Sequence, residues 1–494
     1  MKKYIYFVTN QEHWFNVAKK LYNNKIAEPV LWLGDDVHYN KAKNLFGDSV
    51  IMDLEHRHRN FNLIDIDYNS EYIDFFSSEN YLRAKDICLK MMDRLDLYGV
   101  FGRLDREVYF HKILIWNLKK IYYSKPDVLI TAEAPHDYPK YLIFEICKYL
   151  NIPCYKFSNW MPVPLLFMEN MITKNLVTKD KPMKSQIDDR MNKEIKSFIE
   201  KLQTGKEKYE LFYMKSQRVS SRPINRIKSY FLRGFVEDLK DVKYNLEMFF
   251  KSSYNPINPF TLNYFTRKRN QRLRKKNLIK EISYIEETVS DDLKYVYFPL
   301  HYEPERTTNP DGGFFHDQFI ALTYLRKFIP SDIQIVVKEH PSQLNVNMRG
   351  SRGRSPLIYK LIKNIKGVRL AKTDSNSIKL ILNSEFIATI SGSVALEASI
   401  LGKKSITFGS SWYKGCPNIF EWDQITSYQN MISKKIKSCD DIYDFLINHK
   451  NKYAVSGFIN GSQRKFFKSY ADDDFELKQN KEIYNLLLNF FKNL

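Results

Sequence analysis

Short apolar runs alternate with helical patterns over the first 160 residues. Strands are predicted at residues 4–8, 29–33, 127–131 and directly after 153. Helical spacing of apolar side chains follows His13 and returns from Tyr141 to Tyr149. Strands separated by helices predict a parallel, doubly wound sheet.

The same alternation starts again near residue 290. Further strands are predicted at residues 295–300, 333–338, 367–371, 386–390 and 405–408. An amphipathic helix is predicted at 475–494. The expected fold class is therefore α/β, with two doubly wound, Rossmann-like domains facing a cleft. Ligands of such sheets bind outside the carboxyl ends of the strands.

A basic region separates the two predicted sheets. It has helical patterning in parts, and the run Arg267–Lys280 holds eight basic residues in 14 and no acidic one. This run is either a solvated helix face or a surface that binds anionic lipid or an acidic polymer. The expected domains are residues 1–199, a helical basic insertion at 200–289, a second sheet domain at 290–470 and a terminal helix at 471–494.

Length and charge agree with this division. A chain of 494 residues exceeds the usual size of one hydrophobic core. Its 77 basic and 57 acidic residues give a net charge of +20, which favours an anionic partner. No nucleic-acid-binding module is recognisable, so we do not expect nucleic acid to be that partner.

The cysteines and apolar runs bear on the compartment. The five cysteines show no CxxC spacing, which indicates neither a zinc site nor a disulfide framework. No apolar run is long enough for a signal peptide or a membrane-spanning helix. We expect a cytoplasmic protein, with any membrane contact peripheral and on the inner face of the plasma membrane.

Polar loops follow two predicted strands of the second domain. The strand at 295–300 leads into a loop that contains His301, Glu305 and Asp311, and the strand at 333–338 leads into Lys338-Glu-His-Pro341. Lysine and histidine donate hydrogen bonds to phosphate oxygens, and proline stiffens the turn. Turn-rich surface loops are the alternative interpretation of both segments.

A third loop follows the predicted strand at 386–390. Ser391, Gly392 and Ser393 form a tight turn before a helix that begins near Val394. Hydroxyls and free amides in such a turn can hold phosphate. Glu397, one helical turn further on, could accept hydrogen bonds from a ribose. Simple capping by Ser393 is the alternative, and capping is compatible with phosphate binding.

In this order, the segments 295–313, 337–343, 389–398 and 408–413 resemble the capsule polysaccharide biosynthesis protein family. That family includes Kdo transferases of capsule and lipopolysaccharide assembly. The resemblance covers about residues 290–415 and is weaker at 133–136. It implies a GT-B glycosyltransferase and, from the best-understood members, a CMP-sugar donor.

The resemblance also implies roles for the polar loops. The pair His340-Pro341 is similar to the motif with which GT-B sialyltransferases hold CMP, so His340 would bind the phosphate or ribose of the donor. Ser391 and Ser393 would bind the phosphate, and Glu397 the ribose. The remaining donor-site residues that we assign are His301, Glu305, Lys338 and Gly392.

The first domain is expected to supply the acceptor side. Glu133 and His136 follow the predicted strand at 127–131, and an acceptor hydroxyl needs a base as it attacks. Glu133 is the first choice of base and His136 the second, with Asp311 as a rival from the other domain. A structural His136 beside a capping Asp137 is the alternative interpretation.

The expected reaction transfers Kdo or a nonulosonate to a glycan or glycolipid acceptor, with no cofactor and no metal. CMP leaves with one phosphate, which needs less charge neutralisation than a diphosphate. Asp65-Ile-Asp67 has the spelling of a metal-binding motif, but its alternation with apolar residues is typical of a strand. A CDP-polyol phosphotransferase and a non-catalytic capsule assembly or export factor remain as alternatives.

Overall fold

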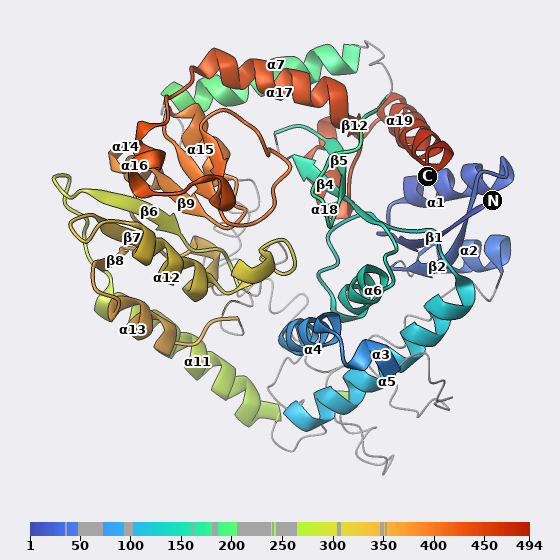
Figure 1. Ribbon diagram of the computed structural model, residues 1–494, viewed down its shortest axis with the longest axis horizontal. Coiled ribbons are helices and arrows are strands. Elements are labelled where there is room, and N and C mark those ends of the chain that lie inside the picture. Colours follow the sequence, from blue (N-terminus) through green and yellow to red (C-terminus); the bar gives the residue numbers. More distant parts are fainter. Residues whose placement is uncertain are drawn as a thin grey trace. The chain divides into compact units, whose positions relative to one another are not determined.

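The computed structural model describes residues 1–34, 37–47, 73–92, 102–160, 162–179, 186–204, 239, 242–243, 264–303, 308–345, 350 and 353–494. They fall into two compact units. The first is drawn from the ranges 1–89, 107–200 and 443–494, and the second from 90–106 and 201–442. Each unit contains one six-stranded sheet (Figure 1).

The first sheet has four parallel strands and an edge with antiparallel pairing. Its strands, in spatial order, are β12 (Ala454–Ser456), β5 (Leu165–Asn170), β4 (Cys154–Trp160), β3 (Val128–Thr131), β1 (Lys2–Phe7) and β2 (Ala27–Leu33). The strands from β4 to β2 pair in parallel, whereas β5 pairs antiparallel with both β4 and β12. The strand order reverses between β1 and β3, so the topological switch point of this sheet lies there.

Helices accompany these strands along the chain. They are α1 (Glu12–Asn23), α2 (Tyr39–Phe46), α3 (Ile73–Phe76), α4 (Glu79–Met92), α5 (Arg103–Ser124), α6 (Tyr138–Tyr149), α7 (Gln186–Thr204), α17 (Cys439–Tyr453), α18 (Gly461–Phe466), the 3-10 helix η9 (Lys468–Tyr470) and α19 (Asp473–Lys492).

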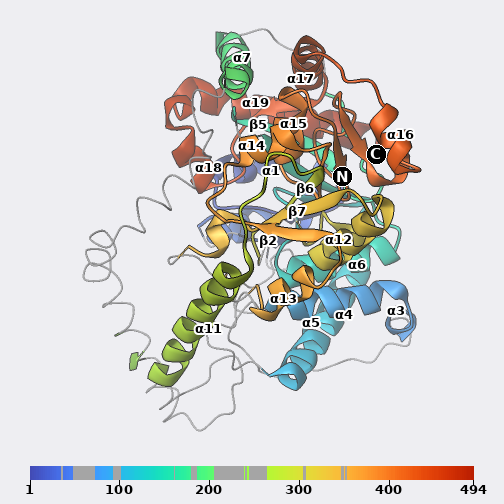
Figure 2. The same ribbon diagram turned by 90° about the vertical axis from the view of Figure 1, so that its left-hand side faces the viewer.

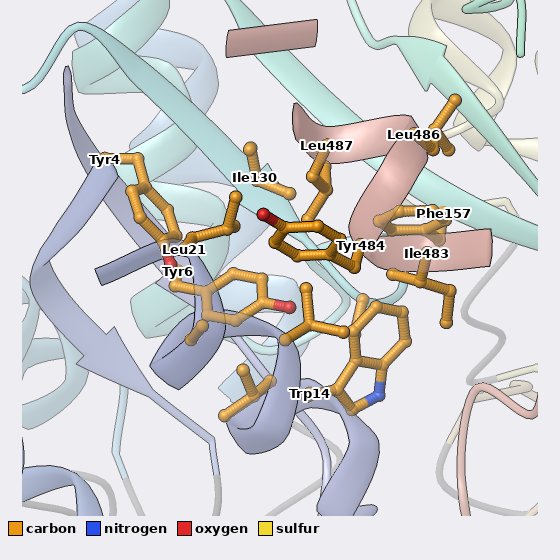
Figure 3. Packing of buried hydrophobic residues seen from close by; sticks show 14 of the residues in the cluster. Tyr4, Tyr6, Trp14, Leu21, Ile130, Phe157, Ile483, Tyr484, Leu486 and Leu487 are labelled. Atoms are coloured by element: carbon orange, nitrogen blue, oxygen red, sulfur yellow. The ribbon is translucent and has the colours of Figure 1, made fainter. Parts of the chain in front are cut away.

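Aromatic side chains form the core of the first unit. Tyr4 and Tyr6 alternate along β1 and therefore point to one face, where they meet Trp14 of α1. Tyr484 and Leu487 of α19 enter the same cluster (Figure 3). Segments that are far apart in the sequence, β1 and α19, thus pack in one core.

This packing changes the expected domain boundary. Val455 of β12 pairs with Leu166 of β5, and α19 packs on α1, so residues 443–494 belong to the first unit. The expected domain at 290–470 is therefore too long, and the helix expected at 471–494 is part of the first core. The apolar face of α19 needs a partner, but its sequence pattern does not say which sheet provides it.

The second sheet is entirely parallel. Its strands, in spatial order, are β11 (Ile419–Glu421), β10 (Ser405–Thr407), β9 (Ile387–Thr389), β6 (Tyr295–Pro299), β7 (Gln334–Lys338) and β8 (Val368–Ala371). The chain runs outward from β6 to β8, returns to β9 and then runs outward the other way. Its switch point lies between β6 and β9.

Helices precede, connect and follow these strands. They are α11 (Tyr264–Ile285), η5 (Gly313–His316), α12 (Gln318–Phe328), η6 (Pro341–Gln343), α13 (Leu357–Lys363), α14 (Ser377–Asn383), α15 (Val394–Ile400), η8 (Trp422–Gln424) and α16 (Tyr428–Ser433), where η denotes a 3-10 helix. Buried residues cover both faces of the sheet, with Val296 and Val337 on one face and Tyr297 and Val336 on the other.

The predicted fold class is confirmed. Strands form at each of the nine predicted places, and the two sheets are doubly wound. The helix α11 confirms helical structure in part of the basic region, and it packs through Leu278, Ile282 and Ile285 into the second core. No helix of the described residues is long and apolar enough to span a membrane.

Candidate functional site

Three polar loops meet at one edge of the second sheet. His301 follows β6, His340 follows β7, and Ser391 to Ser393 follow β9. Because these strands are parallel neighbours, their carboxyl ends share that edge. His301 Nε2 lies 3.1 Å from Thr389 Oγ1 and so joins the ends of β6 and β9. The predicted donor loops therefore surround the switch point, where such folds bind ligands.

A buried ion pair lies beneath the two histidines. Arg354 Nε is 3.0 Å from Glu339 Oε2, and the side chains are only 6% and 0% exposed. Arg354 Nη2 donates to Glu339 Oε1 at 3.1 Å, so the contact is bidentate. The hydroxyl of Tyr359 also donates to Glu339 Oε2, at 2.6 Å. The buried carboxylate thus has hydrogen-bond donors on both of its oxygens.

The same ion pair holds the backbone of both histidines. Arg354 Nη2 donates to the carbonyl oxygen of His301 at 2.8 Å. The backbone N–H of His340 donates to Glu339 Oε1 at 2.7 Å. One buried pair thus fixes the spacing between the loops after β6 and β7.

Two glutamines fix the loop after β6 from either side. Gln318 accepts from the His301 N–H at 2.7 Å and donates to the His301 carbonyl oxygen at 3.2 Å. Gln343 does the same for Glu303, at 2.7 Å and 2.9 Å. Each amide side chain replaces the pairing that a neighbouring strand would give, so the loop is held well beyond the end of β6.

Both histidines are neutral at pH 7. Burial, reinforced by Arg354, lowers the pKa of His301 to about 4. Burial also lowers the pKa of His340 to about 4, with His301, Arg354 and Lys338 acting in the same direction. The Ser342 N–H donates to His340 Nδ1 at 3.1 Å, so the proton of neutral His340 sits on Nε2. His340 can therefore donate one hydrogen bond without carrying charge.

The free energy of unfolding is expected to decrease as the pH is lowered below about 6.5, where the imidazole of an unfolded chain gains its proton. The folded histidines stay neutral down to a pKa of about 4, so the unfolded state binds more protons in this window. Each histidine contributes a slope of at most about 1.4 kcal/mol per pH unit. Urea unfolding between about pH 7 and pH 5 measures the slope, which should be smaller in His340→Asn; an unchanged slope would contradict the assigned neutral state.

The loop after β9 is closely packed around Gly392. A Cβ atom at this position would lie 2.9 Å from Thr389 Oγ1 and 3.3 Å from His301 Cε1. The Tyr413 hydroxyl donates to the Gly392 carbonyl oxygen at 2.6 Å. Glycine is thus required because the chain passes directly over the contact between His301 and Thr389.

The two serines of this loop behave differently. Ser393 is the N-cap residue of α15, but its hydroxyl makes no capping hydrogen bond and instead donates to Glu397 Oε1 at 2.9 Å. Ser391 Oγ is buried and has no hydrogen-bond partner within the described part of the chain. Burial raises the pKa of Glu397, and the Ser393 hydroxyl opposes that rise.

Lys338 contacts the next loop along the sheet. Its ammonium group is buried and donates to the Ser375 carbonyl oxygen at 2.7 Å and to Ser377 Oγ at 2.8 Å. These bonds tie β7 to the turn before α14, and the phosphate contact expected of Lys338 stays a prediction. Pro341 opens η6, for which His340 is the N-cap. Glu305 lies outside the described residues.

The acid–base candidates of the first unit follow β3, beside the switch point of the first sheet. His136 Nδ1 is 2.8 Å from the Ala134 carbonyl oxygen, and its Nε2 is 3.7 Å from Glu133 Oε1. Both side chains are partly buried. Asp137 accepts from the Lys140 N–H at 3.1 Å and caps α6, which confirms the capping interpretation of Asp137.

Asp311 belongs to the second unit. Its carbonyl oxygen accepts from the Ser410 N–H at 3.1 Å, and a Cβ on Gly409 would lie 2.7 Å from that oxygen. The loop after β6 is thus packed against the loop after β10. Among the described residues, no group of three or more His, Cys, Asp and Glu side chains could hold a metal ion. Asp65 and Asp67 lie outside them.

Several site residues escape a search of the sequence. Gln318 and Arg354 contact the backbone of His301 from distant positions in the sequence, and Tyr359 contacts Glu339 in the same way. Only their contacts reveal them. The proline-bounded Lys338-Glu-His-Pro341 run was the one local hint, because it places a carboxylate directly after a buried strand.

The family comparison concerns the same part of the chain. The model of the capsule polysaccharide biosynthesis protein family matches residues 228–419, a range that contains β6 to β10 and the loops predicted to bind the donor. The match confirms the resemblance of this part of the chain to that family. A comparison with curated proteins finds no match.

Solved structures similar to the chain include two transferases and an epimerase. Thermosulfurimonas dismutans KpsC, as the beta Kdo 2,4 transferase, is 16% identical over 35% of this chain and 54% of that one, with a TM-score of 0.23. The KpsC beta Kdo 2,7 transferase is 11% identical over 74% and 88%, with a TM-score of 0.28. The Methanocaldococcus jannaschii UDP-GlcNAc 2-epimerase is 11% identical over 90% and 98%, with a TM-score of 0.22. The chain thus spans about half the length of the first.

Proposed function

We propose that this protein is a glycosyltransferase of capsule or related surface polysaccharide biosynthesis. It transfers an acidic sugar, Kdo or a nonulosonate, from a CMP-sugar to a glycan or lipid-linked acceptor in the cytoplasm. The observation that carries the proposal is the pair of neutral histidines, His301 and His340, beside the switch point of the second sheet. The match of residues 228–419 to a capsule biosynthesis family supports the pathway.

The proposed chemistry follows from the charge of the leaving group. The bond between the anomeric carbon and a phosphate oxygen of the donor breaks, and that oxygen gains charge as CMP departs. The Nε2–H of His340 and the Ser391 hydroxyl, which has no partner among the described residues, are donors suited to a single phosphate. In this proposal no cofactor or metal is needed.

The ribose is assigned to Glu397. Its carboxylate already accepts a hydrogen bond from Ser393 at 2.9 Å and is partly buried, one helical turn beyond the loop after β9. A carboxylate accepts hydrogen bonds from both hydroxyls of a ribose. Glu397 would thus select a nucleotide over a simple phosphate ester.

The acceptor hydroxyl is assigned to the first unit. Its oxygen attacks the anomeric carbon while its proton passes to a carboxylate or imidazole, and the new glycosidic bond replaces the bond to CMP. Glu133 is the proposed base because its carboxylate follows β3, at the carboxyl edge of the first sheet. His136, 3.7 Å away, holds Glu133 in place or replaces it.

The proposal is tested by offering purified protein CMP-Kdo, a CMP-nonulosonate and CDP-glycerol, each with a capsular oligosaccharide acceptor. CMP release together with a mass gain of one acidic sugar on the acceptor supports the proposal. Transfer of glycerol phosphate from CDP-glycerol would instead establish the polyol phosphotransferase. Absence of turnover and of nucleotide binding would favour the non-catalytic assembly or export factor.

A further inference from the structure

Two neighbouring helices of the second unit carry a strongly basic surface. Among the described side chains of α11, five cations are exposed, namely Arg269, Arg272, Arg274, Lys276 and Lys280. Lys360 and Lys363 are exposed on α13, and Lys366 follows it. Glu281 is the single carboxylate among the described side chains of these two helices, and Lys360 Nζ is 3.1 Å from it. We call this region the α11–α13 surface.

The two helices lie side by side and are anchored from below. Figures 1 and 2 both show α13 alongside α11, and their residues are in contact. Leu278 and Ile282 of α11 are buried in the same cluster as Tyr359 and Ile362 of α13. Their opposite faces are therefore held at fixed positions on the outside of the unit.

Large apolar side chains are exposed among these cations. Leu357 and Leu361 lie one helical turn apart on α13 and are 66% and 47% exposed. On α11, Leu273 and Tyr284 are 42% and 86% exposed. Leu273, Lys280 and Tyr284 have the spacing i, i+7 and i+11, so they lie on one stripe of α11. This stripe is next to Glu281, which contacts Lys360 of α13.

We propose that the α11–α13 surface docks on an anionic lipid bilayer, with Leu357 and Leu361 inserted among the headgroups. Helices that lie in a membrane interface combine a cationic face with apolar side chains at its border, as here. An acidic glycan would use the charge but would leave both leucines in water. A bilayer binds the cations and also buries the leucines, so it accounts for both features of the surface.

The docking would serve a lipid-linked acceptor, because it keeps the protein on the surface where such an acceptor is anchored. It does not depend on the identity of the donor. Docking and catalysis can therefore fail separately, and each has its own measurement.

Sedimentation with vesicles tests the docking. The full-length protein is mixed with vesicles of phosphatidylcholine alone or of phosphatidylcholine with phosphatidylglycerol. We expect binding to the anionic vesicles only, weakened by salt. Changing Arg272, Arg274 and Lys276 together to Gln should lower the partition coefficient on the order of a hundredfold. Leu357→Ala with Leu361→Ala should lower it on the order of tenfold.

Matched controls distinguish the effect of this surface from the effect of removing any exposed cations or apolar side chains. Lys19, Lys465 and Lys468, changed together to Gln, remove three exposed cations of the first unit. Leu382→Ala with Leu477→Ala removes two exposed leucines elsewhere, which are 45% and 71% exposed. Neither control should change the partition coefficient beyond about twofold.

Three outcomes would overturn the proposal. Equal binding to neutral and anionic vesicles would remove the role of the cations, and a loss in the control variants equal to that in the test variants would remove the role of this surface. Binding to a soluble acidic polysaccharide but not to vesicles would replace the lipid by the glycan. Unchanged circular dichroism and CMP affinity in the variants show that they are folded. If the wild-type protein does not bind CMP at all, that result counts only against the proposed donor, and circular dichroism alone shows that the variants are folded.

Discussion

Changing Arg354 to methionine is expected to lower the free energy of unfolding by roughly 3–5 kcal/mol, the usual consequence of leaving a buried charge without its partner. Glu339 is fully buried and shares two hydrogen bonds with Arg354. Methionine fills much of the space but donates nothing, so the carboxylate must either stay unpaired or take up a proton. Urea unfolding followed by far-ultraviolet circular dichroism measures the loss.

A matched control comes from a second arginine of the same unit. Arg369 pairs with Glu287 at 3.3 Å, but both side chains are 45% exposed. Arg369→Met is therefore expected to cost less than about 1 kcal/mol. Equal losses in the two variants would show that the Arg354 pair is not specially important. The double variant Arg354→Met with Glu339→Gln should recover part of the loss, because it removes the buried charge together with its partner.

Changing Glu133 to glutamine is expected to reduce turnover by roughly a hundredfold or more, with CMP affinity unchanged. Glutamine has the same shape as glutamate but does not accept a proton at neutral pH. The contact to His136 can persist through the amide group, so the local fold should be kept. Steady-state kinetics with saturating donor, beside calorimetry with CMP, separates the loss of a base from a loss of binding.

Two further variants distinguish Glu133 from other carboxylates that could act as the base. Asp311→Asn should leave turnover within a few-fold of the wild type if Glu133 is the base. Asp137→Asn should act on stability alone, since Asp137 caps α6. Near-normal turnover in Glu133→Gln together with a large loss in Asp311→Asn would move the base to the second unit.

The sequence predicts most of the scaffold because each buried strand has a strong local signature. The run Tyr295-Val-Tyr-Phe and the run Ile335-Val-Val are apolar throughout, which is typical of strands covered on both faces. The predicted strand ends then place His301, His340 and Ser391 at the carboxyl edge of the second sheet from the sequence alone. That part of the site follows from periodicity and from the geometry of parallel sheets.

The rest of the site depends on contacts between distant segments. Arg354 lies in a loop rich in Gly, Ser and Arg, and nothing there distinguishes one arginine from its neighbours. Only folding brings Arg354 against Glu339 and the His301 carbonyl. The placement of α19 could not be predicted for the same reason. Its apolar stripe could cover either sheet, and the pairing of β12 with β5 brings it to the first one. Such choices are made by tertiary packing rather than by local pattern.

The most direct test is calorimetric titration of the purified protein with CMP, CDP, UDP and GDP without added metal. The proposed function predicts selective binding of CMP, weakened by roughly 1–3 kcal/mol in His340→Ala through loss of a hydrogen bond to the nucleotide. His111→Ala, which removes a partly buried histidine of the first unit, should bind CMP like the wild type. Preference for UDP or GDP, or CMP binding that His340→Ala leaves unchanged, would contradict the proposal.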